Sequence, residues 1–410
     1  MYRALLLFSV FGSLLISPNL LYFFGIKYGF AEGSAIEKIH PTLISILLLF
    51  TLAKFFAFKT FPNFKSARTP AFMLCAVSIL TMLIFFVSSG ESGGGELSSI
   101  LMTFLHPALL VLVLGYAGQN SISLICRFMP WLFIVNSALG LIEAATNFRT
   151  LPFVAAEVLV NFDPRPTALF GHPLVNSLLT GGWVLLLLMK AFKSTLRLRD
   201  VPVFALHIIA MLAFGGRAAF VTCVGVLALY VVIHSISRAW QGYGRKEFAK
   251  AVALISVAFL SVPIILYSGA ADGILSRVAD SRGSNETRLA AFEMVQLLSP
   301  AEWLIGVPNA TREYLLRTLG TEYGVEISWV GLLLSYGLPL TVLLLFSMFW
   351  ILTSVGKKIG DQGAYATLYF AIVTFTSTSI SGKTLIISAF LAMYVAMFDR
   401  RSFDDSRQHN

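Results

Sequence analysis

The sequence predicts an all-α, polytopic membrane protein with about twelve transmembrane helices, built as a single transmembrane domain over residues 1–410. Two observations predict this fold class. Hydrophobic residues make up 57% of the chain and charged residues only 12%, whereas a soluble domain has roughly 25% charged residues. Apolar runs of about 20 residues, the length that crosses a bilayer, recur along the chain. The composition therefore excludes an ordinary soluble enzyme, a disordered chain and a disulfide-stapled secreted module.

Apolar run length gives the position of each expected span. The net charge of +9 is explained by basic residues in cytoplasmic loops, so no nucleic-acid partner is expected. Most lysines fall on the side that holds Arg3, which predicts that both termini are cytoplasmic. The three cysteines lie in apolar runs without a CxxC pair, so no zinc site is predicted. In order, the expected spans cover residues 4–24, 42–58, 71–89, 98–117, 122–146, 173–189, 201–215, 218–236, 251–268, 327–352, 364–379 and 384–398.

The connection 269–325, between spans nine and ten, is the longest in the chain. Loops beyond about 12–15 residues are usually functional or disordered, and this one has helix signals. Ser284 or Asn285 can cap a helix that runs to about Leu298 and stops at Ser299-Pro300. Residues 311–319, followed by glycine, form a second expected helix. We expect a compact helical cap on the external face.

Arginine is the only basic residue of this expected cap, and two arginines are the first candidates for binding phosphate. Arg282 and Arg288 bracket the start of its first helix. A guanidinium binds phosphate through a planar fork, and helix N-terminal amides add a second attraction for an anion. The alternative is that each arginine forms a surface ion pair with a neighbouring acid.

Two more arginines and a histidine lie near the external ends of other spans. Arg217 follows two glycines in an apolar stretch, where a charge costs about 2.5–3.5 kcal/mol and indicates a function. The alternative explanation for Arg217 is structural: its side chain extends from a tight turn toward water. Arg165 lies between two prolines, upstream of His172. His172 is a candidate general base or phosphate donor, although a lone histidine is more often structural.

Glu326 stands at the external entrance of span ten. A carboxylate beside apolar surface can accept a proton near neutral pH, and the alternative is a salt bridge to a nearby arginine. Lys383 lies in a Ser-Gly-Lys-Thr segment that mimics the end of a nucleotide-binding loop. Ser377 occupies the place of the first glycine and the segment faces outward, so that interpretation is rejected and Lys383 remains an additional anion contact.

The chain has no DxD, HExxH, GxSxG or nucleotide-binding motif. A metal-dependent transferase that uses sugar nucleotides is therefore disfavoured, and neither a metal nor a cofactor is expected. Any transfer reaction would use a donor that is already activated on a lipid.

Three short patterns, in the same order and all external, are similar to the O-antigen ligase and Wzy-type polysaccharide polymerase superfamily of bacterial inner membranes. They are Arg165 to Pro173, the Gly216-Arg217-Ala218 turn, and the long loop with the span after it, from Arg288 to Leu338. The resemblance covers less than half of the chain. Ligases of the superfamily carry His-Asn where this chain has Glu326-Ile327, and the carboxylate resembles the polymerase branch instead.

The resemblance implies metal-independent glycosyl transfer on the periplasmic face of the inner membrane. Its donor is an oligosaccharide on undecaprenyl pyrophosphate, and the acceptor is a sugar hydroxyl of a second lipid-linked unit. Glu326 and Arg288 are then the catalytic residues, while Arg165, His172, Arg217, Arg282 and Arg288 bind substrate.

Three other functions remain open: an O-antigen ligase, a flippase or transporter of lipid-linked glycans, and a structural subunit of a polysaccharide assembly complex. Transporters usually have repeated halves and charges near the middle of the membrane. Here the charges cluster at one face, which favours the enzyme. The expected partners are the lipid-linked oligosaccharide, the bilayer and other polysaccharide assembly proteins.

Overall fold

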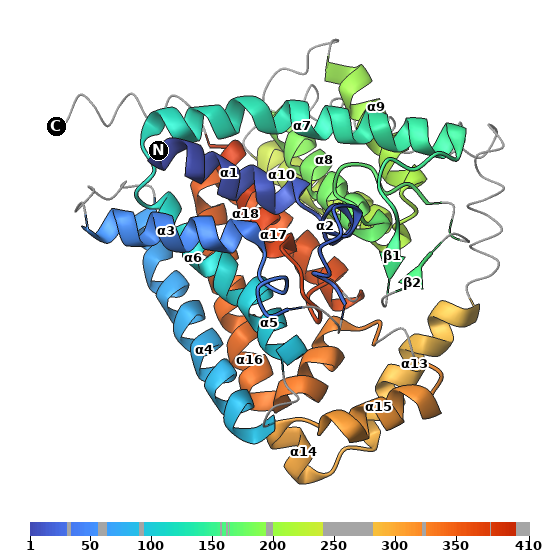
Figure 1. Cartoon of the computed structure of the whole chain (residues 1–410). Helices are drawn as coiled ribbons and strands as arrows, with labels where there is room; N and C mark the ends of the chain where they lie inside the picture. Colours follow the sequence, from blue (N-terminus) through green and yellow to red (C-terminus); the bar gives the residue numbers. More distant parts are fainter. Residues whose placement is uncertain are drawn as a thin grey trace.

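A computed structural model describes the chain except residues 31–33, 56–63, 90–93, 156–157, 161–162, 164, 194–199, 241–281, 322–324, 378 and 399–410. The described part is helical apart from two short antiparallel strands, in which Val154 pairs with Leu159 (Figure 1). The elements, in chain order, are α1 (Tyr2–Leu15), α2 (Pro18–Phe23), α3 (Pro41–Phe55), α4 (Lys65–Ser89), α5 (Gly94–Ile100), the π-helix η3 (Leu101–Leu105), α6 (His106–Leu114), α7 (Gln119–Thr146), β1 (Val154–Ala155), β2 (Val158–Leu159), α8 (Pro173–Lys193), α9 (Val201–Ala213), α10 (Arg217–Trp240), α13 (Arg282–Gln296), α14 (Pro300–Ile305), α15 (Asn309–Thr318), α16 (Ser328–Gly356), the 3-10 turn η5 (Lys357–Ile359), α17 (Asp361–Phe375) and α18 (Ile386–Ala396).

Six stretches of helix in the described residues are long and apolar enough to cross a membrane. They cover Lys65–Val87, Leu97–Leu114, Gln119–Thr146, Pro173–Lys193, Arg217–Ser237 and Ser328–Ile359. The all-α, multi-pass character is thus confirmed, but the expected number of twelve spans is not. Four further apolar helices, α1, α3, α9 and α18, are shorter. The expected span 251–268 lies outside the described residues.

The first expected span, 4–24, is divided into two helices. Ser17 Oγ accepts a hydrogen bond from the backbone N–H of Leu20 at 3.1 Å, which caps α2. Pro18 has no N–H to continue α1 and is well suited to the first turn of a new helix. A local capping signal therefore interrupts the apolar run.

Helix α16 is bent at Gly337, whose φ of 74° and ψ of 168° are not helical. The bend leaves the carbonyl of Leu334 free to accept the backbone N–H of Val307 at 2.7 Å. Pro339 adds to the break because it cannot donate to a carbonyl one turn earlier. The segment that follows α14 is thereby hydrogen-bonded to α16 at its bend.

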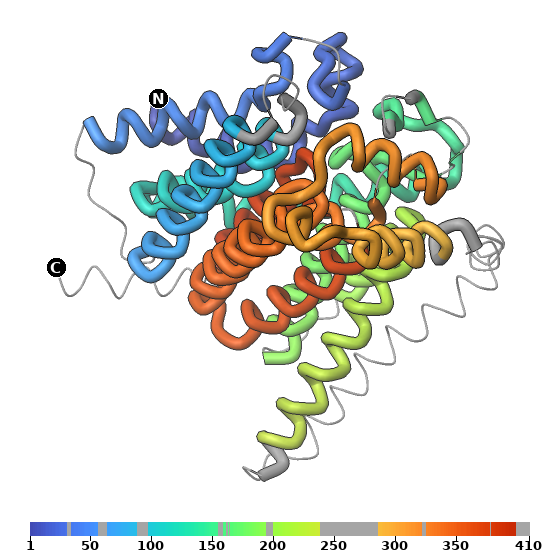
Figure 2. Tube along the Cα trace, turned by 90° about the horizontal axis from the view of Figure 1, so that it is seen from below, coloured from blue at the N-terminus to red at the C-terminus, as the bar shows by residue number. Residues whose placement is uncertain are grey.

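The described part of the cap between residues 269 and 325 consists of three helices joined by short loops, and Figure 2 shows α13, α14 and α15 lying across the face seen from below. Helix α13 begins at Arg282, slightly before the expected caps. Ser299-Pro300 ends it as expected but also starts α14, because Ser299 and Glu302 form a reciprocal capping box.

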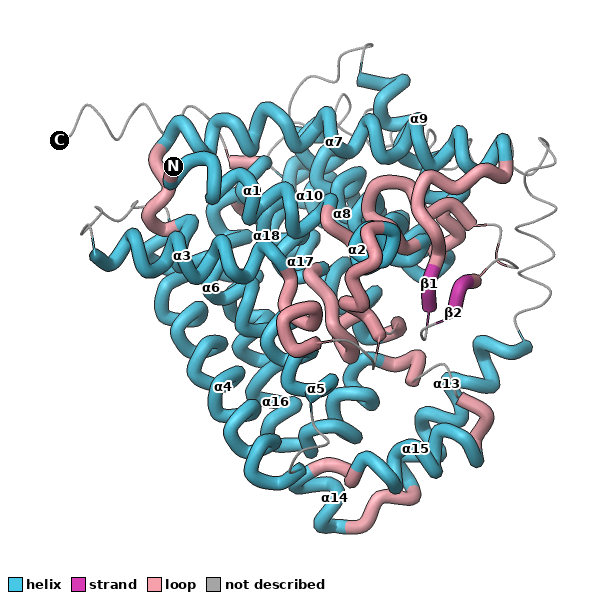
Figure 3. The backbone as a smooth tube through the Cα atoms, in the orientation of Figure 1, coloured by secondary structure: helices cyan, strands magenta, loops and turns pink. Residues whose placement is uncertain are grey.

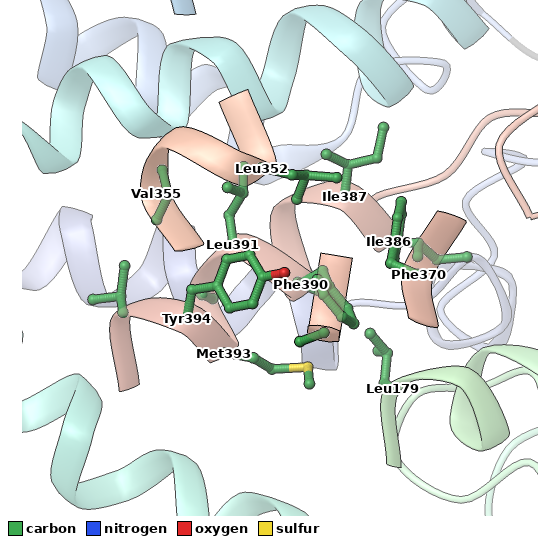
Figure 4. Packing of buried hydrophobic residues seen from close by; sticks show 14 of the residues in the cluster. Leu179, Leu352, Val355, Phe370, Ile386, Ile387, Phe390, Leu391, Met393 and Tyr394 are labelled. Carbon is green, nitrogen blue, oxygen red and sulfur yellow. The ribbon is translucent and has the colours of Figure 1, made fainter. Parts of the chain in front are cut away.

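The centre of the bundle is α18, in which every residue is buried. Figure 4 shows Phe390 and Tyr394 of this helix among side chains of other helices, including Leu179 of α8 and Phe370 of α17. The rings of Phe370 and Phe390 have centroids 4.7 Å apart. A helix that is apolar on all sides belongs in the interior of a bundle, so the loop before α18 emerges from the middle of the protein.

Candidate functional site

The first turns of α8 and α10 meet at one end of the bundle. Ser177 Oγ in α8 donates a hydrogen bond to the carbonyl of Gly216 at 3.3 Å. A Cβ at Gly216 would lie 2.2 Å from Ser177 Oγ, so a side chain there would separate the helices. Arg217 follows as the first residue of α10 and is exposed, and His172 immediately precedes α8. Two predicted site residues thus share this end.

The start of α16 and the loop after α17 also meet each other. The backbone N–H of Ser328 donates to the carbonyl of Ser377 at 3.1 Å. The N–H of Ile380 donates to Ser328 Oγ, also at 3.1 Å. Glu326 stands two residues before Ser328, so it is held beside the loop that carries Lys383. Figure 3 shows how the connecting loops gather around α2 and the strands.

The opposite end of the bundle carries a separate ionic cluster. Asp361, which begins α17, is paired with Lys193 at the end of α8. His234 Nε2 of α10 lies 2.6 Å from the other oxygen of Asp361. Burial opposes ionisation of Asp361, but the hydrogen bond and charge of Lys193 and the charge of His234 outweigh it, so the pKa of Asp361 is lowered. Since α8 has 21 residues, about 31 Å at 1.5 Å per residue, this cluster is far from His172.

A cavity of about 210 Å³ lies at the end that holds His172. Its polar lining comes from four separate stretches of chain and includes His40, His172 and Lys383. Hydroxyl groups of Ser17 and Thr384 add to it. The rest of the wall is largely aliphatic or aromatic: Leu14, Ile16, Phe170, Leu174, Val175, Leu179, Leu385 and Ile386. The cavity is therefore polar on one side and apolar on the other.

Both histidines of the cavity are neutral at pH 7. Burial, and then the charge of Arg165, lower the pKa of His172 to about 4, with Asp163 opposing in part. Burial lowers the pKa of His40 to about 4, although its hydrogen bond to the carbonyl of Ile16 opposes this. His172 Nδ1 accepts the N–H of Leu174 at 3.2 Å. Its Nε2 therefore carries the hydrogen and is available as a donor.

Lys383 is the cation of the cavity. Its Nζ donates to the carbonyl of Tyr28 at 2.8 Å and lies 3.5 Å from the centre of the Tyr28 ring. Burial, and to a smaller extent the charge of Lys38, lower the pKa of Lys383 to about 7. The side chain is therefore poised between its charged and neutral forms at physiological pH.

Arg165 lies close behind His172 but is already paired. Its Nε donates to Asp163 Oδ2 at 2.7 Å, and its Nη2 makes a second bond to the same carboxylate. This fork-to-fork pair leaves part of the guanidinium unused. An anion at Arg165 would have to share it with Asp163.

Arg288 of α13 and Glu326 form an ion pair, with Nε and Oε2 3.5 Å apart. Both side chains are partly exposed, at 42% and 35%. The alternative that the sequence left open for Glu326, a salt bridge to a neighbouring arginine, is thus present. Arg282 begins α13, but its side chain lies outside the described residues.

The predicted residues therefore form groups rather than one cluster. His172 lines the cavity with Arg165 behind it, Arg288 and Glu326 pair beneath the cap, and Arg217 is exposed at the start of α10. In the described part of the chain no hydrogen bond or ion pair joins Arg217 to Arg288.

Sequence reasoning missed Tyr28, His40 and His106. His40, His106 and His172 each precede a proline at the start of a helix, α3, α6 or α8. His40 Nδ1 lies 2.6 Å from Thr42 Oγ1, which lies 2.9 Å from His106 Nε2. The three His-Pro pairs were a signal that could have drawn attention to this group. Tyr28 had no such signal.

Six long apolar helices indicate a multi-pass membrane protein, and one end of its bundle holds a cavity with a polar and an apolar side. Within the described residues, no group of three histidine, cysteine or acidic side chains could hold a metal ion. Comparison with protein families, curated proteins and solved structures gave no match.

Proposed function

We propose that the protein polymerises lipid-linked oligosaccharide repeat units of an exopolysaccharide, capsule or O-antigen, with undecaprenyl pyrophosphate as the carrier. One observation carries the proposal: His172, Lys383, Arg217 and the Arg288–Glu326 pair come from distant stretches of chain and lie at the same end of the helices. Such an end suits a substrate whose head group leaves the bilayer while its tail stays in it.

The proposed face is the periplasmic one. Lys190 and Lys193 at the end of α8, and Lys357 and Lys358 after α16, lie at the opposite end. Basic residues concentrate on the cytoplasmic side of membrane proteins. The membrane is then the bacterial inner membrane, and the cap faces the periplasm.

In the proposed reaction, the acceptor hydroxyl attacks the anomeric carbon of the donor and the bond from that carbon to the diphosphate breaks. Arg288 stabilises the charge that develops on the diphosphate. Glu326 takes the proton of the acceptor hydroxyl. The diphosphate would draw Arg288 toward itself and so separate it from the Glu326 carboxylate, with which it is paired before substrate binds. A single displacement inverts the anomeric configuration.

The bilayer contributes by holding both lipid tails, so the protein has only to orient two head groups. His172, Arg165 and Arg217 are proposed to contact the donor head group, and Arg282 to assist from the start of α13. Transfer to a non-polymer acceptor, as in a ligase, uses the same residues and differs only in the acceptor.

A flippase or transporter of lipid-linked glycans is the second candidate, and it is considered because two ionisable side chains, His40 and His106, lie buried in the bundle. Ionisable side chains inside membrane proteins often mark transport pathways. The two functions differ in where intermediates accumulate. Loss of a flippase leaves single repeat units inside the cell, whereas loss of a polymerase leaves them on the outer face.

The experiment is complementation of a polymer-deficient strain by Arg288→Lys and Glu326→Gln variants. We expect each to lower polymer at least tenfold while the protein still accumulates in membranes and single units remain on the outer face. Arg317→Lys is the matched control, because Arg317 is an exposed cap arginine with a weak pair to Glu313 at 4.0 Å. Near-normal polymer from Arg288→Lys would refute the proposed role, and trapping of units inside would favour transport.

A further inference from the structure

The contacts of Lys383 are with uncharged groups of Tyr28. In the described part of the chain no carboxylate pairs with it, and its Nζ is bound only by the carbonyl and the ring of Tyr28. An ammonium has three N–H donors, so at least one is left over. A lysine with unused donors can bind a phosphate or sulfate as a point charge.

The groups around Lys383 are mostly basic or neutral. Tyr28 and Lys38 belong to the segment before α3, which ends at His40. His172 lines the same cavity from the start of α8. Two carboxylates of neighbouring segments are already engaged, since Asp163 accepts from Arg165 and Glu37 accepts from Ser34. Among the described residues, the lining of the cavity contains no carboxylate that would repel an anion.

The position of Lys383 is fixed from both sides by one hydroxyl group. Thr103 Oγ1 donates to the carbonyl of Gly382 at 2.7 Å and accepts the N–H of Thr384 at 3.1 Å. Thr103 is buried in η3, a π-helical segment. Pro107 explains this segment, since it has no N–H for the carbonyl of Thr103 and its ring crowds it. The anion contact is thus built in before a ligand arrives.

We propose that this cavity binds a tetrahedral oxyanion that carries a short apolar chain, and that Lys383 takes up a proton as the anion enters. The phosphate or sulfate group would lie at Lys383 and the hydroxyls of Ser17 and Thr384. The chain would lie along Phe170, Leu179 and the rest of the apolar wall. This inference does not need the glycosyl transfer proposed above.

Proton uptake follows from the surroundings of Lys383. Burial disfavours its charged form, which is why its pKa is about 7 before binding. A bound anion restores the charged form and raises the pKa toward its ordinary value of about 10.4. At pH 8 a lysine with a pKa of about 7 is roughly one-tenth protonated, so binding takes up about 0.9 proton from solvent.

The test uses the full-length protein in lipid nanodiscs and titration calorimetry at pH 8, repeated in buffers of different ionisation enthalpy to count protons. The probes are hexyl sulfate, inorganic sulfate and hexan-1-ol, with empty nanodiscs as the blank. Sulfates do not titrate near pH 8, so any proton uptake belongs to the protein. Inorganic sulfate reports a site for a free ion, and hexyl sulfate a site for an amphiphile.

We expect hexyl sulfate to bind with uptake of about 0.9 proton, and at least tenfold more tightly than either other probe. Lys383→Arg should bind it within a few-fold of wild type but without proton uptake, because arginine is always charged. Lys383→Met should bind at least tenfold more weakly. Lys358→Met, which changes an exposed lysine at the other end, should behave as wild type.

The proposal fails if correctly folded Lys383→Met, judged by a single gel-filtration peak and an unfolding temperature at pH 8 no lower than that of wild type, binds hexyl sulfate as wild type does. It also fails if Lys383→Arg retains the proton uptake, or if hexan-1-ol binds as well as hexyl sulfate. If inorganic sulfate binds as tightly as hexyl sulfate, the apolar wall does not bind the chain of the ligand and that part of the proposal is wrong.

Discussion

Replacing Thr103 by valine removes one hydroxyl group and keeps the shape of the side chain. The carbonyl of Gly382 and the N–H of Thr384 then lose their partner, and Thr103 is only 1% exposed. Leaving two such groups unsatisfied costs about 2–4 kcal/mol. The loop can avoid this cost by opening to water, so we expect the substitution to release Lys383 rather than to unfold the bundle.

A cost of about 2–4 kcal/mol corresponds to a roughly 30- to 1,000-fold change in the equilibrium between closed and open loop. The assay is the rate at which a water-soluble amine reagent labels Lys383, measured by mass spectrometry, with exposed Lys358 as the internal reference. Thr103→Ser keeps the hydroxyl and should label close to wild type. If the valine and serine variants label at the same rate, Thr103 does not position Lys383.

Three other predictions concern stability in detergent. Because Lys383 has a pKa of about 7 in the folded protein, below its unfolded value of about 10.4, the unfolded chain holds more protons between these values and stability rises with pH there. Lys383→Met should therefore raise the unfolding temperature at pH 6, and the gain should shrink toward pH 10. The pKa of Asp361 is lowered, so its contribution is present above its unfolded pKa of about 3.9 and is lost as the pH falls through the folded value. Asp361→Asn should cost about 0.5–1 kcal/mol at pH 7, as expected for a partly exposed pair, and chemical denaturation should show this cost shrinking as the pH falls below about 3.9. Gly337→Ala adds a Cβ 2.3 Å from the carbonyl oxygen of Leu304 at a positive φ, and should speed proteolysis of the cap, whereas Gly225→Ala, which meets no atom within 4 Å, should not.

Hydropathy identified where the chain is helical but not where each helix is interrupted. The apolar residues of 4–24 continue across Ser17 and Pro18, and run length alone cannot register a cap and a proline within the run. The same limitation hid the bend at Gly337, since the side chains on either side of it are apolar. In both places the deciding term is the satisfaction of backbone hydrogen bonds, which depends on one or two residues.

Individual residues of the candidate site could be predicted from the sequence, but the contacts between them could not. Charge in an apolar chain drew attention to Arg217, His172 and Lys383, because such charge is costly wherever it lies. The pairing of Lys383 with Tyr28 joins residues 355 positions apart, and no local pattern encodes it. Whether Glu326 was paired was likewise left open by sequence, because its partner, Arg288, belongs to a different helix.

In the buried group of His40, Thr42 and His106, the donor of each hydrogen bond can be assigned from the outermost partners, Ile16 and Ser388. The carbonyl of Ile16 can only accept, so His40 Nε2, at 2.7 Å from it, carries a hydrogen. Neutral His40 then accepts from Thr42 at Nδ1, and Thr42 Oγ1 accepts from His106 Nε2. His106 Nδ1 is left to accept from the hydroxyl of Ser388, 2.7 Å away.

A proton path needs groups that can reverse the direction of their hydrogen bonds. The hydrogen bonds from Ile16 to Ser388 cannot reverse without a change of charge, because the carbonyl of Ile16 can only accept. Reversal would turn His40 into a buried imidazolium that donates to the carbonyl of Ile16 and to the hydroxyl of Thr42, which is expensive in an apolar interior. The group therefore acts as a brace: His106 holds Thr42 and His40 on one side, while Thr103, in the same distorted turn, holds the loop of Lys383 on the other. A rigid cavity wall serves an enzyme that must fix a head group better than a transporter that must let it pass, and this favours the transferase over the flippase.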